Sequence, residues 1–304
     1  MKKLVLAALL ATFAAGASAA DKINFGVSAT YPPFESLDAS NQIVGFDIDL
    51  AKALCKQIQA DCTFTNHAFD SLIPSLKFKK YDAVISGMDI TPERSKQVAF
   101  TDPYYANSAV VIAKKGAYKS FDELKGKRIG MENGTTHQKY LQDKHPEVKT
   151  VAYDSYQNAI IDLKNGRIDG VFGDTAVVNE WLKTNPQLGT ATEKVTDPQY
   201  FGTGLGIAVR PDNKALLAKL NGALKAIKAD GTYQKISEQW FPQKGVLPGD
   251  GFALPGLRGG FCRPDKRSAT RQFSQRHKEP ESCPTHRLHE PYSTAVQLQH
   301  PFDD

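Results

Sequence analysis

Short apolar segments of strand length alternate along this chain with longer segments whose apolar residues recur at the helical period. The segments with strand character are 23–27, 83–86, 109–113, 128–131 and 170–172. The segments with helical character are 47–60, 70–77, 136–144, 155–165 and 213–229. Strands that alternate with helices are typical of α/β proteins, in which helices connect neighbouring parallel strands. We therefore predict an α/β fold with mostly parallel sheets.

Composition narrows the class of protein further. The 304 residues include 41% apolar and 23% charged side chains, which is an ordinary globular composition and argues against a collagen, a coiled coil or a fully disordered chain. The net charge of +5 is small for this length and does not favour nucleic-acid binding. After the first 20 residues no apolar run approaches the length needed to cross a bilayer, so we expect a soluble mature protein.

The N-terminus has the pattern of a secretory signal. Lys2 and Lys3 precede an apolar run over 4–15, and the small residues Ala17, Ser18 and Ala19 follow it. We predict cleavage after about Ala19; the alternative is a buried first helix. No cysteine follows the apolar run, so a lipoprotein anchor is not supported. Export places the chain in an oxidising compartment.

Cys55 and Cys62 lie seven residues apart, at the end of one predicted helix and the start of strand-like residues. In an exported protein this arrangement favours a structural disulfide, although two buried free thiols are an alternative. A zinc site is not favoured, because no second pair of ligands follows at a matching distance.

The composition changes after Gln243. The last 61 residues hold six arginines, seven prolines and four of the seven histidines, with few apolar residues and no period among them. Such a segment buries too little apolar surface to offset the entropy lost on ordering, so we predict that 244–304 is disordered. Cys262, Cys283 and the histidines show no metal-ligand spacing.

Two segments of the chain resemble each other. In both 76–89 and 163–174 a helix end is followed by a turn, a buried strand and a loop with a glycine, ending at Asp89 and Asp174. Ligands of open α/β sheets collect at the carboxyl ends of strands, so these aspartates are expected to face one cleft. The alternative is that both aspartates only cap the helices that follow them.

Arg94 lies in a predicted first helical turn, with Thr91 as N-cap and Pro92 at the first position. A cation there opposes the helix dipole, which suggests that an anion such as a carboxylate binds beside it. The alternative is a surface arginine that pairs with Glu93 or Asp89.

A second helix start follows Glu132, in the sequence Asn133-Gly134-Thr135-Thr136-His137. Its free N–H groups would suit an anion, and a carboxylate held between Arg94 and Thr136 would draw two lobes together. His137 would be a possible base, but no nucleophile motif accompanies it, and we favour a helix-start residue. The rings of Tyr31 and Phe69 follow strand-like residues and are expected either to stack on a flat ligand group or to belong to the core.

Five motifs in order carry a resemblance to a known family. They are Tyr31-Pro32-Pro33-Phe34, Gly45-Phe46-Asp47-Ile48-Asp49-Leu50, Phe69-Asp70-Ser71-Leu72-Ile73-Pro74-Ser75-Leu76, Asp89-Ile90-Thr91-Pro92-Glu93-Arg94 and Tyr200-Phe201-Gly202-Thr203-Gly204. With them the chain resembles the polar amino-acid solute-binding proteins of ABC importers, from Met1 to about Gln243. The tail has no counterpart in that family.

The resemblance implies a two-lobed periplasmic-binding-protein fold with a ligand cleft between the lobes. Residues 1–19 would be the signal peptide, 20–107 plus 204–243 lobe one, 108–203 lobe two and 244–304 the tail, with two crossover strands as the hinge. It also implies a periplasmic monomer that binds an amino acid, delivers it to an inner-membrane ABC permease, and uses no cofactor or metal.

Roles of single residues follow from the resemblance by position. Tyr31 and Phe69 would sandwich the ligand side chain, Arg94 and the Thr136 backbone would take the carboxylate, and Asp174, Asp89 and the Ser86 carbonyl would take the α-amino group. The full set of expected ligand-binding residues is Ser28, Tyr31, Phe69, Ser86, Gly87, Asp89, Arg94, Glu132, Thr136, His137 and Asp174.

The acids Asp89 and Glu132 suggest a cationic ligand. We predict L-arginine, because a planar guanidinium can stack between Tyr31 and Phe69 while donating to a carboxylate. Lysine, ornithine and histidine are alternatives within the family. An exported enzyme on this fold, such as a small dehydratase, is a less favoured alternative, and the sensor part of a receptor would need a membrane segment.

Overall fold

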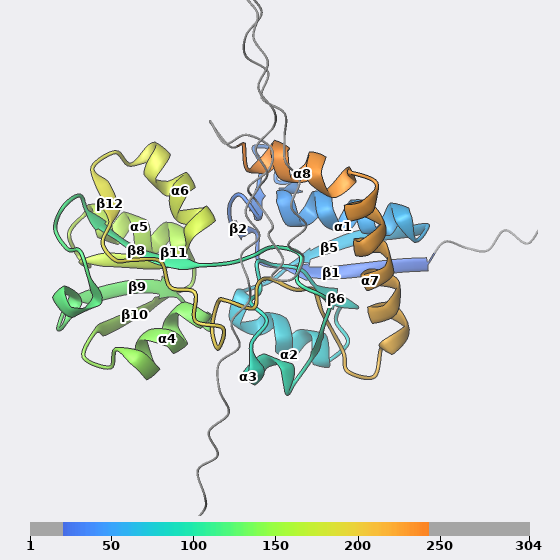
Figure 1. Cartoon of the computed structure of the whole chain (residues 1–304), viewed down its shortest axis with the longest axis horizontal. Coiled ribbons are helices and arrows are strands. Elements are labelled where there is room, and N and C mark those ends of the chain that lie inside the picture. Colours follow the sequence, from blue (N-terminus) through green and yellow to red (C-terminus); the bar gives the residue numbers. More distant parts are fainter. Residues whose placement is uncertain (1–20, 243–304) are drawn as a thin grey trace, which may run out of the picture. The chain divides into compact units, whose positions relative to one another are not determined.

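A computed structural model describes residues 21–242. The predicted signal peptide, the tail 244–304 and Cys262 and Cys283 lie outside these residues. Within them the chain forms two five-stranded sheets, each with its own helices, together with a small three-stranded sheet. Figure 1 shows the two groups of elements, one in blue, cyan and orange and the other in green and yellow. We call the part around the first sheet lobe one and the part around the second lobe two.

The sheet of lobe one has the strand order β5-β1-β6-β13-β7. These strands are β5 (Ala60–Asn66), β1 (Asp21–Val27), β6 (Ala83–Val84), β13 (Ala208–Val209) and β7 (Ala99–Phe100). β1 lies parallel to β5 and β6, whereas β13 lies antiparallel to β6 and β7. The small sheet, β2 (Thr30–Tyr31), β3 (Glu35–Leu37) and β4 (Ile43–Val44), belongs to the same part of the chain.

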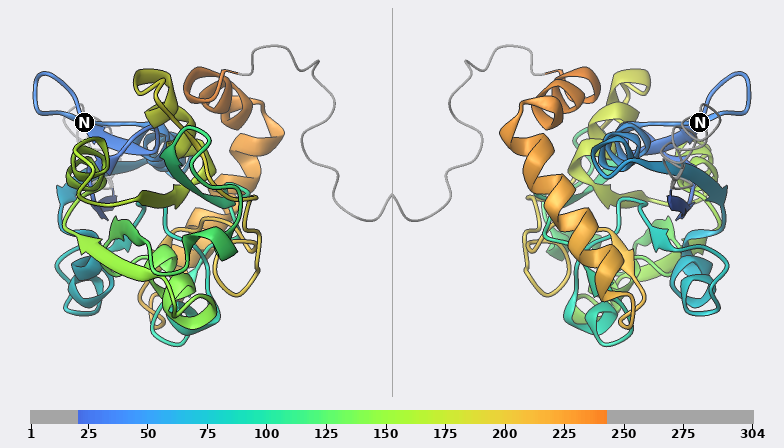
Figure 2. Two further views of the ribbon diagram at one scale, coloured as in Figure 1. Left: turned by 90° about the vertical axis from the view of Figure 1, so that its left-hand side faces the viewer. Right: turned by 90° about the vertical axis from the view of Figure 1, so that its right-hand side faces the viewer.

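Segments from both ends of the described chain cover the first sheet. The helices are α1 (Phe46–Gln57), η1 (Phe69–Ser71), α2 (Leu72–Lys77), α3 (Pro92–Ser95), α7 (Lys214–Ala229) and α8 (Thr232–Trp240). The orange α7 and α8 pack beside the blue α1, as Figures 1 and 2 show. α1 buries Ile48, Ala51, Leu54 and Cys55, which recur at the helical period that the sequence shows.

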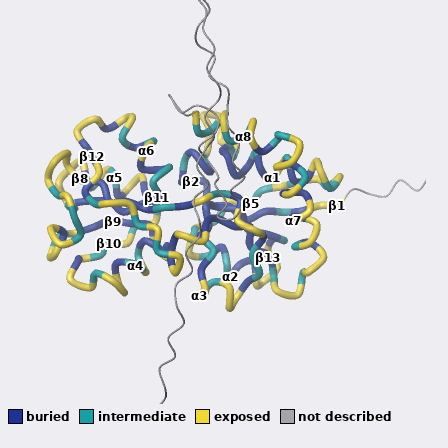
Figure 3. The backbone as a smooth tube through the Cα atoms, in the orientation of Figure 1, coloured by how far each residue is buried: buried dark blue, intermediate teal, exposed yellow. Residues whose placement is uncertain are grey.

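The sheet of lobe two has the order β10-β9-β11-β8-β12. Its strands are β10 (Lys149–Tyr153), β9 (Arg128–Glu132), β11 (Gly170–Asp174), β8 (Ala109–Lys114) and β12 (Leu188–Thr190), and its helices are η2 (Phe121–Leu124), α4 (Thr136–Lys144), α5 (Tyr156–Lys164) and α6 (Thr175–Thr184). Side chains of β8, β9 and β11 are almost completely buried, and Figure 3 shows the buried strands between helices that expose their outer faces.

The prediction of mostly parallel sheets is wrong, because each sheet has two parallel and two antiparallel pairings. The antiparallel strands β8 and β13 are those that the chain enters after it passes from one sheet to the other. Neighbouring strands are parallel when a right-handed βαβ connection joins them within one sheet. A strand that the chain enters from the other sheet has no such connection, so it can run antiparallel. The two crossover segments themselves meet in an isolated antiparallel bridge between Tyr105 and Leu205.

The local predictions agree with the structure to within a few residues. α4 spans the predicted 136–144, while α1 ends at Gln57 and leaves Ala60 to begin β5. A disulfide joins Cys55 of α1 to Cys62 of β5, with 6.1 Å between the Cα atoms, so the predicted bridge is confirmed. Among residues 21–242 no helix is long and apolar enough to cross a membrane.

Candidate functional site

A cavity lies where residues of both lobes meet. Its volume is about 20 Å³. Its lining residues are Ser28, Tyr31, Glu35, Phe69, Gly87, Asp89, Glu132, Thr135, Thr136, His137, Tyr156 and Asp174. The lining is rich in carboxyl groups and aromatic rings, which is the chemistry expected of a site for a cation.

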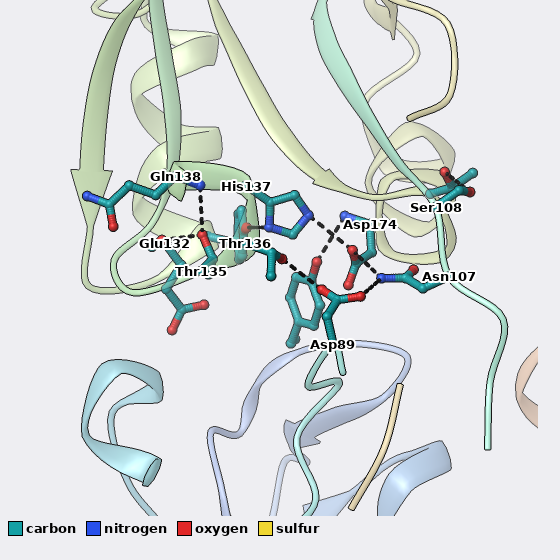
Figure 4. A network of polar contacts seen from close by, with 12 residues as sticks. Asp89, Asn107, Ser108, Glu132, Thr135, Thr136, His137, Gln138 and Asp174 are labelled. Carbon is teal, nitrogen blue, oxygen red and sulfur yellow. Dashed lines mark hydrogen bonds and ion pairs between the residues drawn. The ribbon is translucent and has the colours of Figure 1, made fainter. Parts of the chain in front are cut away.

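Asp89 and Asp174 come together in this cavity through a third residue. The Nδ2 atom of Asn107 donates to Asp89 Oδ1 at 2.7 Å and to Asp174 Oδ1 at 2.8 Å (Figure 4). Asp89 follows β6 of lobe one, Asp174 ends β11 of lobe two, and Asn107 lies in the first crossover segment. The alternative of simple helix caps does not hold, because Thr91 caps α3 and the Asp174 side chain makes no capping bond to α6.

The first turn of α4 contributes two more polar contacts. Thr136 Oγ1 donates to Asp89 Oδ2 at 2.7 Å, which links the lobes, and Thr135 caps the helix by accepting from the Gln138 N–H (Figure 4). His137 Nε2 lies 3.0 Å from Asp174 Oδ1, and its Nδ1 lies 2.9 Å from the Tyr156 hydroxyl. A carboxylate only accepts, so Nε2 carries the proton and donates to Asp174.

Burial raises the pKa of Asp89 well above its ordinary value, and the nearby charge of Asp174 raises it further. Arg94 and the hydrogen bonds from Asn107 and Thr136 act in the opposite direction. Two buried carboxylates close to each other repel, so a cation placed between them is stabilised strongly. The Asn107 amide, which is neutral, cannot supply that charge.

Glu132 ends β9 and is 4% exposed. Its Oε1 atom is buried and has no hydrogen-bond partner among the described residues. Burial raises the pKa of Glu132 to about 8, with contributions from the charges of Asp70 and Asp154. In Figure 4 its carboxyl group extends away from the start of α4. A buried carboxyl oxygen without a donor is costly, so this group suits a ligand that donates to it.

The two rings expected to stack on the ligand, Tyr31 and Phe69, contact different neighbours in the structure. Tyr31 stacks on Tyr156 with 5.0 Å between ring centroids, and its hydroxyl accepts from the Asp174 N–H at 3.0 Å. Phe69 instead lies under the guanidinium of Arg94, whose Cζ is 5.5 Å from the ring centroid. Both rings nevertheless border the cavity.

Arg94 borders a second, larger cavity of about 750 Å³ rather than the first. Its Nη1 donates to the Asp89 carbonyl at 3.0 Å and its Nη2 to the Gly134 carbonyl at 3.3 Å, so it spans both lobes. Among residues 21–242 no carboxylate forms an ion pair with it. Arg94 therefore does not form the ion pair with Glu93 or Asp89 that the sequence offered as an alternative. Thr136 borders both cavities.

A family model described as bacterial extracellular solute-binding proteins, family 3, matches residues 23–243, which is more than half of the chain. The chain belongs to this family. Its fold is the two-lobed one of the family's periplasmic binding proteins, as the resemblance implied.

Relatives in the family are named as binding proteins for arginine or for histidine. The chain is 88% identical over 243 residues to the ABC transporter arginine-binding protein 1 of Escherichia coli K12, covering 80% of this chain and 100% of the relative. It is 40% identical over 253 residues to the histidine-binding periplasmic protein of Salmonella typhimurium, covering 79% and 97%. A solved Salmonella typhimurium periplasmic binding protein, described as having high arginine specificity, matches with 59% identity and a TM-score of 0.71, covering 73% of this chain and all of that one.

Most residues that the family resemblance pointed to border the first cavity. The exceptions are Arg94, which lies in the second cavity, and Ser86, whose fully buried hydroxyl accepts from the Ser28 N–H and donates to Glu35. The cavity also includes Glu35, Thr135 and Tyr156, which the sequence did not single out. Asn107 was missed as well, since an asparagine in a connecting segment belongs to no motif. No cluster with metal-binding composition occurs in the described part of the chain.

Proposed function

We propose that this chain captures L-arginine in the periplasm and delivers it to an ABC importer of the inner membrane. The observation that carries the proposal is the unpartnered Oε1 of Glu132, buried at the edge of a cavity that also holds Asp89 and Asp174. Four acids, Glu35 included, line the first cavity among the described residues, and no lysine or arginine does. The three acids used here, Asp89, Glu132 and Asp174, favour a ligand with two positive groups. The names of the relatives support arginine among such ligands.

The residues divide into two groups in this proposal. Asp89 and Asp174 bind the α-ammonium group where the Asn107 amide now bridges them, and Arg94 with the start of α4 binds the carboxylate. Glu132 binds the guanidinium, which lies near the rings of Tyr31 and Phe69. Ser28, Gly87 and His137 complete the walls, and the Ser86 carbonyl also accepts from the α-ammonium group. The lobe boundaries lie at about residues 107 and 204, where the chain crosses between the lobes. The two crossover segments therefore act as the hinge.

Isothermal titration calorimetry over arginine, lysine, ornithine, histidine and glutamine tests the ligand. We expect arginine to bind tightest, because the guanidinium offers planar, paired donors to Glu132 while stacking on an aromatic ring. Lysine or histidine binding as tightly as arginine would contradict the assignment. Glutamine, which has a similar length and no charge, is the matched control for the charge of the side chain.

We also propose that the protein binds without turnover, acts as a monomer, and is exported with cleavage after about Ala19. The relatives are named for binding and transport. Recovery of unchanged arginine after long incubation tests the first point, and light scattering tests the second. N-terminal sequencing of the exported protein tests the third; a retained N-terminal segment would overturn it.

A further inference from the structure

Glu35, which lines the cavity, and Asp47, which lies behind it, are two buried acids to which the proposed function gives no role. Glu35 is 1% exposed and Asp47 is fully buried. Neither acid forms an ion pair with a cation among residues 21–242. Two ionised carboxylates, both buried and without a cation, would strongly destabilise the folded protein. At least one of the two acids is therefore expected to hold a proton.

The backbone brings the two acids together. The N–H groups of Phe46 and Asp47 donate to the carbonyls of Pro33 and Phe34, both at 2.9 Å, which ties the start of α1 to the start of β3. The side chains of Glu35 and Asp47 form hydrogen bonds with two consecutive residues, Ser86 and Gly87. Ser86 Oγ donates to Glu35 Oε1 at 2.9 Å, and the Gly87 N–H donates to Asp47 Oδ2 at 2.7 Å.

One oxygen of each acid remains without a partner. Glu35 Oε2 and Asp47 Oδ1 are both buried and accept no hydrogen bond from the described residues. A single proton between these two oxygens would satisfy both, because a protonated carboxyl donates and a carboxylate accepts.

The surroundings decide which acid holds the proton. Asp47 Oδ2 accepts from two donors, Gly87 N–H and the Tyr104 hydroxyl at 2.9 Å, and Asp47 lies in the first turn of α1, where the helix dipole favours a negative charge. Glu35 has one donor, the Ser86 hydroxyl, and no helix end.

We propose that Glu35 holds a proton on Oε2 and donates it to Asp47 Oδ1, and that this acid–carboxylate pair positions the Ser86–Gly87 turn in the wall of the ligand site. The pair then carries one negative charge instead of two. Gly87 borders the cavity directly, and Ser86 holds the Ser28 N–H at 2.8 Å. Asp47 does not border the cavity and acts on the ligand through the turn, as a positioning residue, whereas Glu35 acts through the turn and also lines the cavity.

The electrostatic surroundings agree with this placement of the proton. Burial raises the pKa of Glu35 well above its ordinary value, and the charge of Asp47 and a hydrogen bond with it raise it further. The pKa of Asp47 is raised by burial only to about 6, because its bonds with Gly87, Glu35 and Tyr104 lower it. The other titratable groups that face the pair are Tyr104, Glu132 and Tyr233, all of which are neutral or negative.

Infrared difference spectroscopy on the unliganded full chain tests the shared proton. At neutral pH, wild type minus Glu35→Gln is expected to show the carbonyl stretch of one protonated carboxylic acid. Wild type minus Asp47→Asn is expected to show the same band, because the new amide donates to Glu35 and leaves that carboxyl ionised. Glu193→Gln, at an exposed glutamate, is the control and should show only ionised carboxylate bands. If the Glu35 and Asp47 variants lose bands of ionised carboxylates and no band of a protonated acid, the proposal is overturned.

Thermal melting gives a second readout that needs no ligand. A raised folded-state pKa means that the stability due to Glu35 is complete at low pH and is lost as the pH rises through that pKa. The melting temperature of wild type should therefore fall from pH 6 to 9 more steeply than that of Glu35→Gln. Equal slopes would contradict the proposal.

The positioning role is tested with L-arginine, and this arm rests on the proposed function. Glu35→Ala leaves the Ser86 hydroxyl and Asp47 without their partner and should weaken binding by about tenfold. Glu35→Gln supplies an amide donor in place of the proton and should restore most of that loss. Equal losses of arginine affinity in both variants would overturn the positioning role. Absence of arginine binding in wild type would refute only the proposed function. The infrared and melting results do not depend on arginine binding, so they would still test the shared proton.

Discussion

At the scale of single residues, Arg94 and Glu132 carry the opposite charges that we propose to meet the two ends of the ligand. Arg94 spans both lobes through the carbonyls of Asp89 and Gly134, while Glu132 keeps one carboxyl oxygen without a donor. If these residues meet opposite ends of an amino acid, their substitutions will have different effects on different ligands.

We expect Arg94→Ala to weaken every amino-acid ligand by roughly 2 to 5 kcal/mol, because it leaves the ligand carboxylate without its partner. Glu132→Gln should weaken arginine more than glutamine, since it removes only the charge. Titration calorimetry of both variants with both ligands measures this, with Arg167→Ala, at an exposed ion pair with Asp162, as the control. Unchanged arginine affinity in Glu132→Gln would place the guanidinium elsewhere, at Asp89 or Ser28.

The raised pKa of Glu132 predicts a pH dependence. With a pKa of about 8 in the unliganded protein, Glu132 is mostly protonated at pH 7 and must release its proton to pair with a guanidinium. Arginine affinity should therefore rise from pH 6 to 8, by at most about tenfold per pH unit for one proton. The dependence should be weaker in Glu132→Gln. A pH profile that is the same in both proteins would show that Glu132 does not release the proton.

At the scale of the elements, α1 carries two features that connect it to its surroundings. Its C-terminal end is joined to β5 by the Cys55–Cys62 disulfide, and its N-terminus follows Gly45, whose φ is 142°. Trp240 of α8 donates to Asp49 of α1 at 2.8 Å. The helix is therefore held at both ends and along its side.

Reduction of the disulfide should destabilise the protein without changing ligand preference. Closing so short a loop contributes roughly 2 to 3 kcal/mol in the chain-entropy model. Thermal melting with and without reductant measures the loss, and the Cys55→Ser/Cys62→Ser variant should melt where the reduced wild type does. A change in the order of ligand affinities on reduction would show that the bridge shapes the site.

Gly45→Ala should destabilise lobe one by several kcal/mol, because a Cβ there would lie 2.1 Å from the Phe34 carbonyl oxygen. Gly222→Ala is the matched control, since it lies inside α7 with no atom within 4 Å of an added Cβ. That control should stabilise the protein by roughly 0.5 to 1 kcal/mol through helix propensity. Chemical denaturation compares the two, and a Gly45→Ala protein as stable as wild type would refute the argument.

At the scale of the whole molecule, the family match ends at residue 243, and 243 residues of the chain align with the full length of the Escherichia coli relative. The two lobes of the described part are joined by two crossover segments and by side-chain contacts from both sides, such as Thr136 to Asp89 and Asn133 to Asp70.

Removal of residues 244–304 should leave arginine affinity and the melting temperature nearly unchanged. The expectation comes from the composition of this segment, which offers few apolar residues for a core. Calorimetry and thermal melting of the shortened and full chains measure both quantities. A large drop in either would show that the segment packs on the binding protein.

The sequence by itself determined the features that depend on neighbouring residues along the chain. The helical period gave α4 and α7 nearly to the residue, Thr91 and Pro92 marked the start of α3, and the spacing of Cys55 and Cys62 indicated their bridge. The ordered motifs indicated the family and most of the residues that line the cavity.

Only the tertiary structure decided the contacts between segments far apart in the chain. It made β8 and β13 antiparallel, set Asn107 between Asp89 and Asp174, stacked Tyr31 on Tyr156, and brought Glu35 to Asp47. None of these has a local signal, because an asparagine in a connecting segment or a glutamate in a short strand looks the same in the sequence whether it meets water or a buried carboxylate. Burial and the placement of partners arise only when the crossovers and sheets close the chain upon itself, and these set the charge of the site.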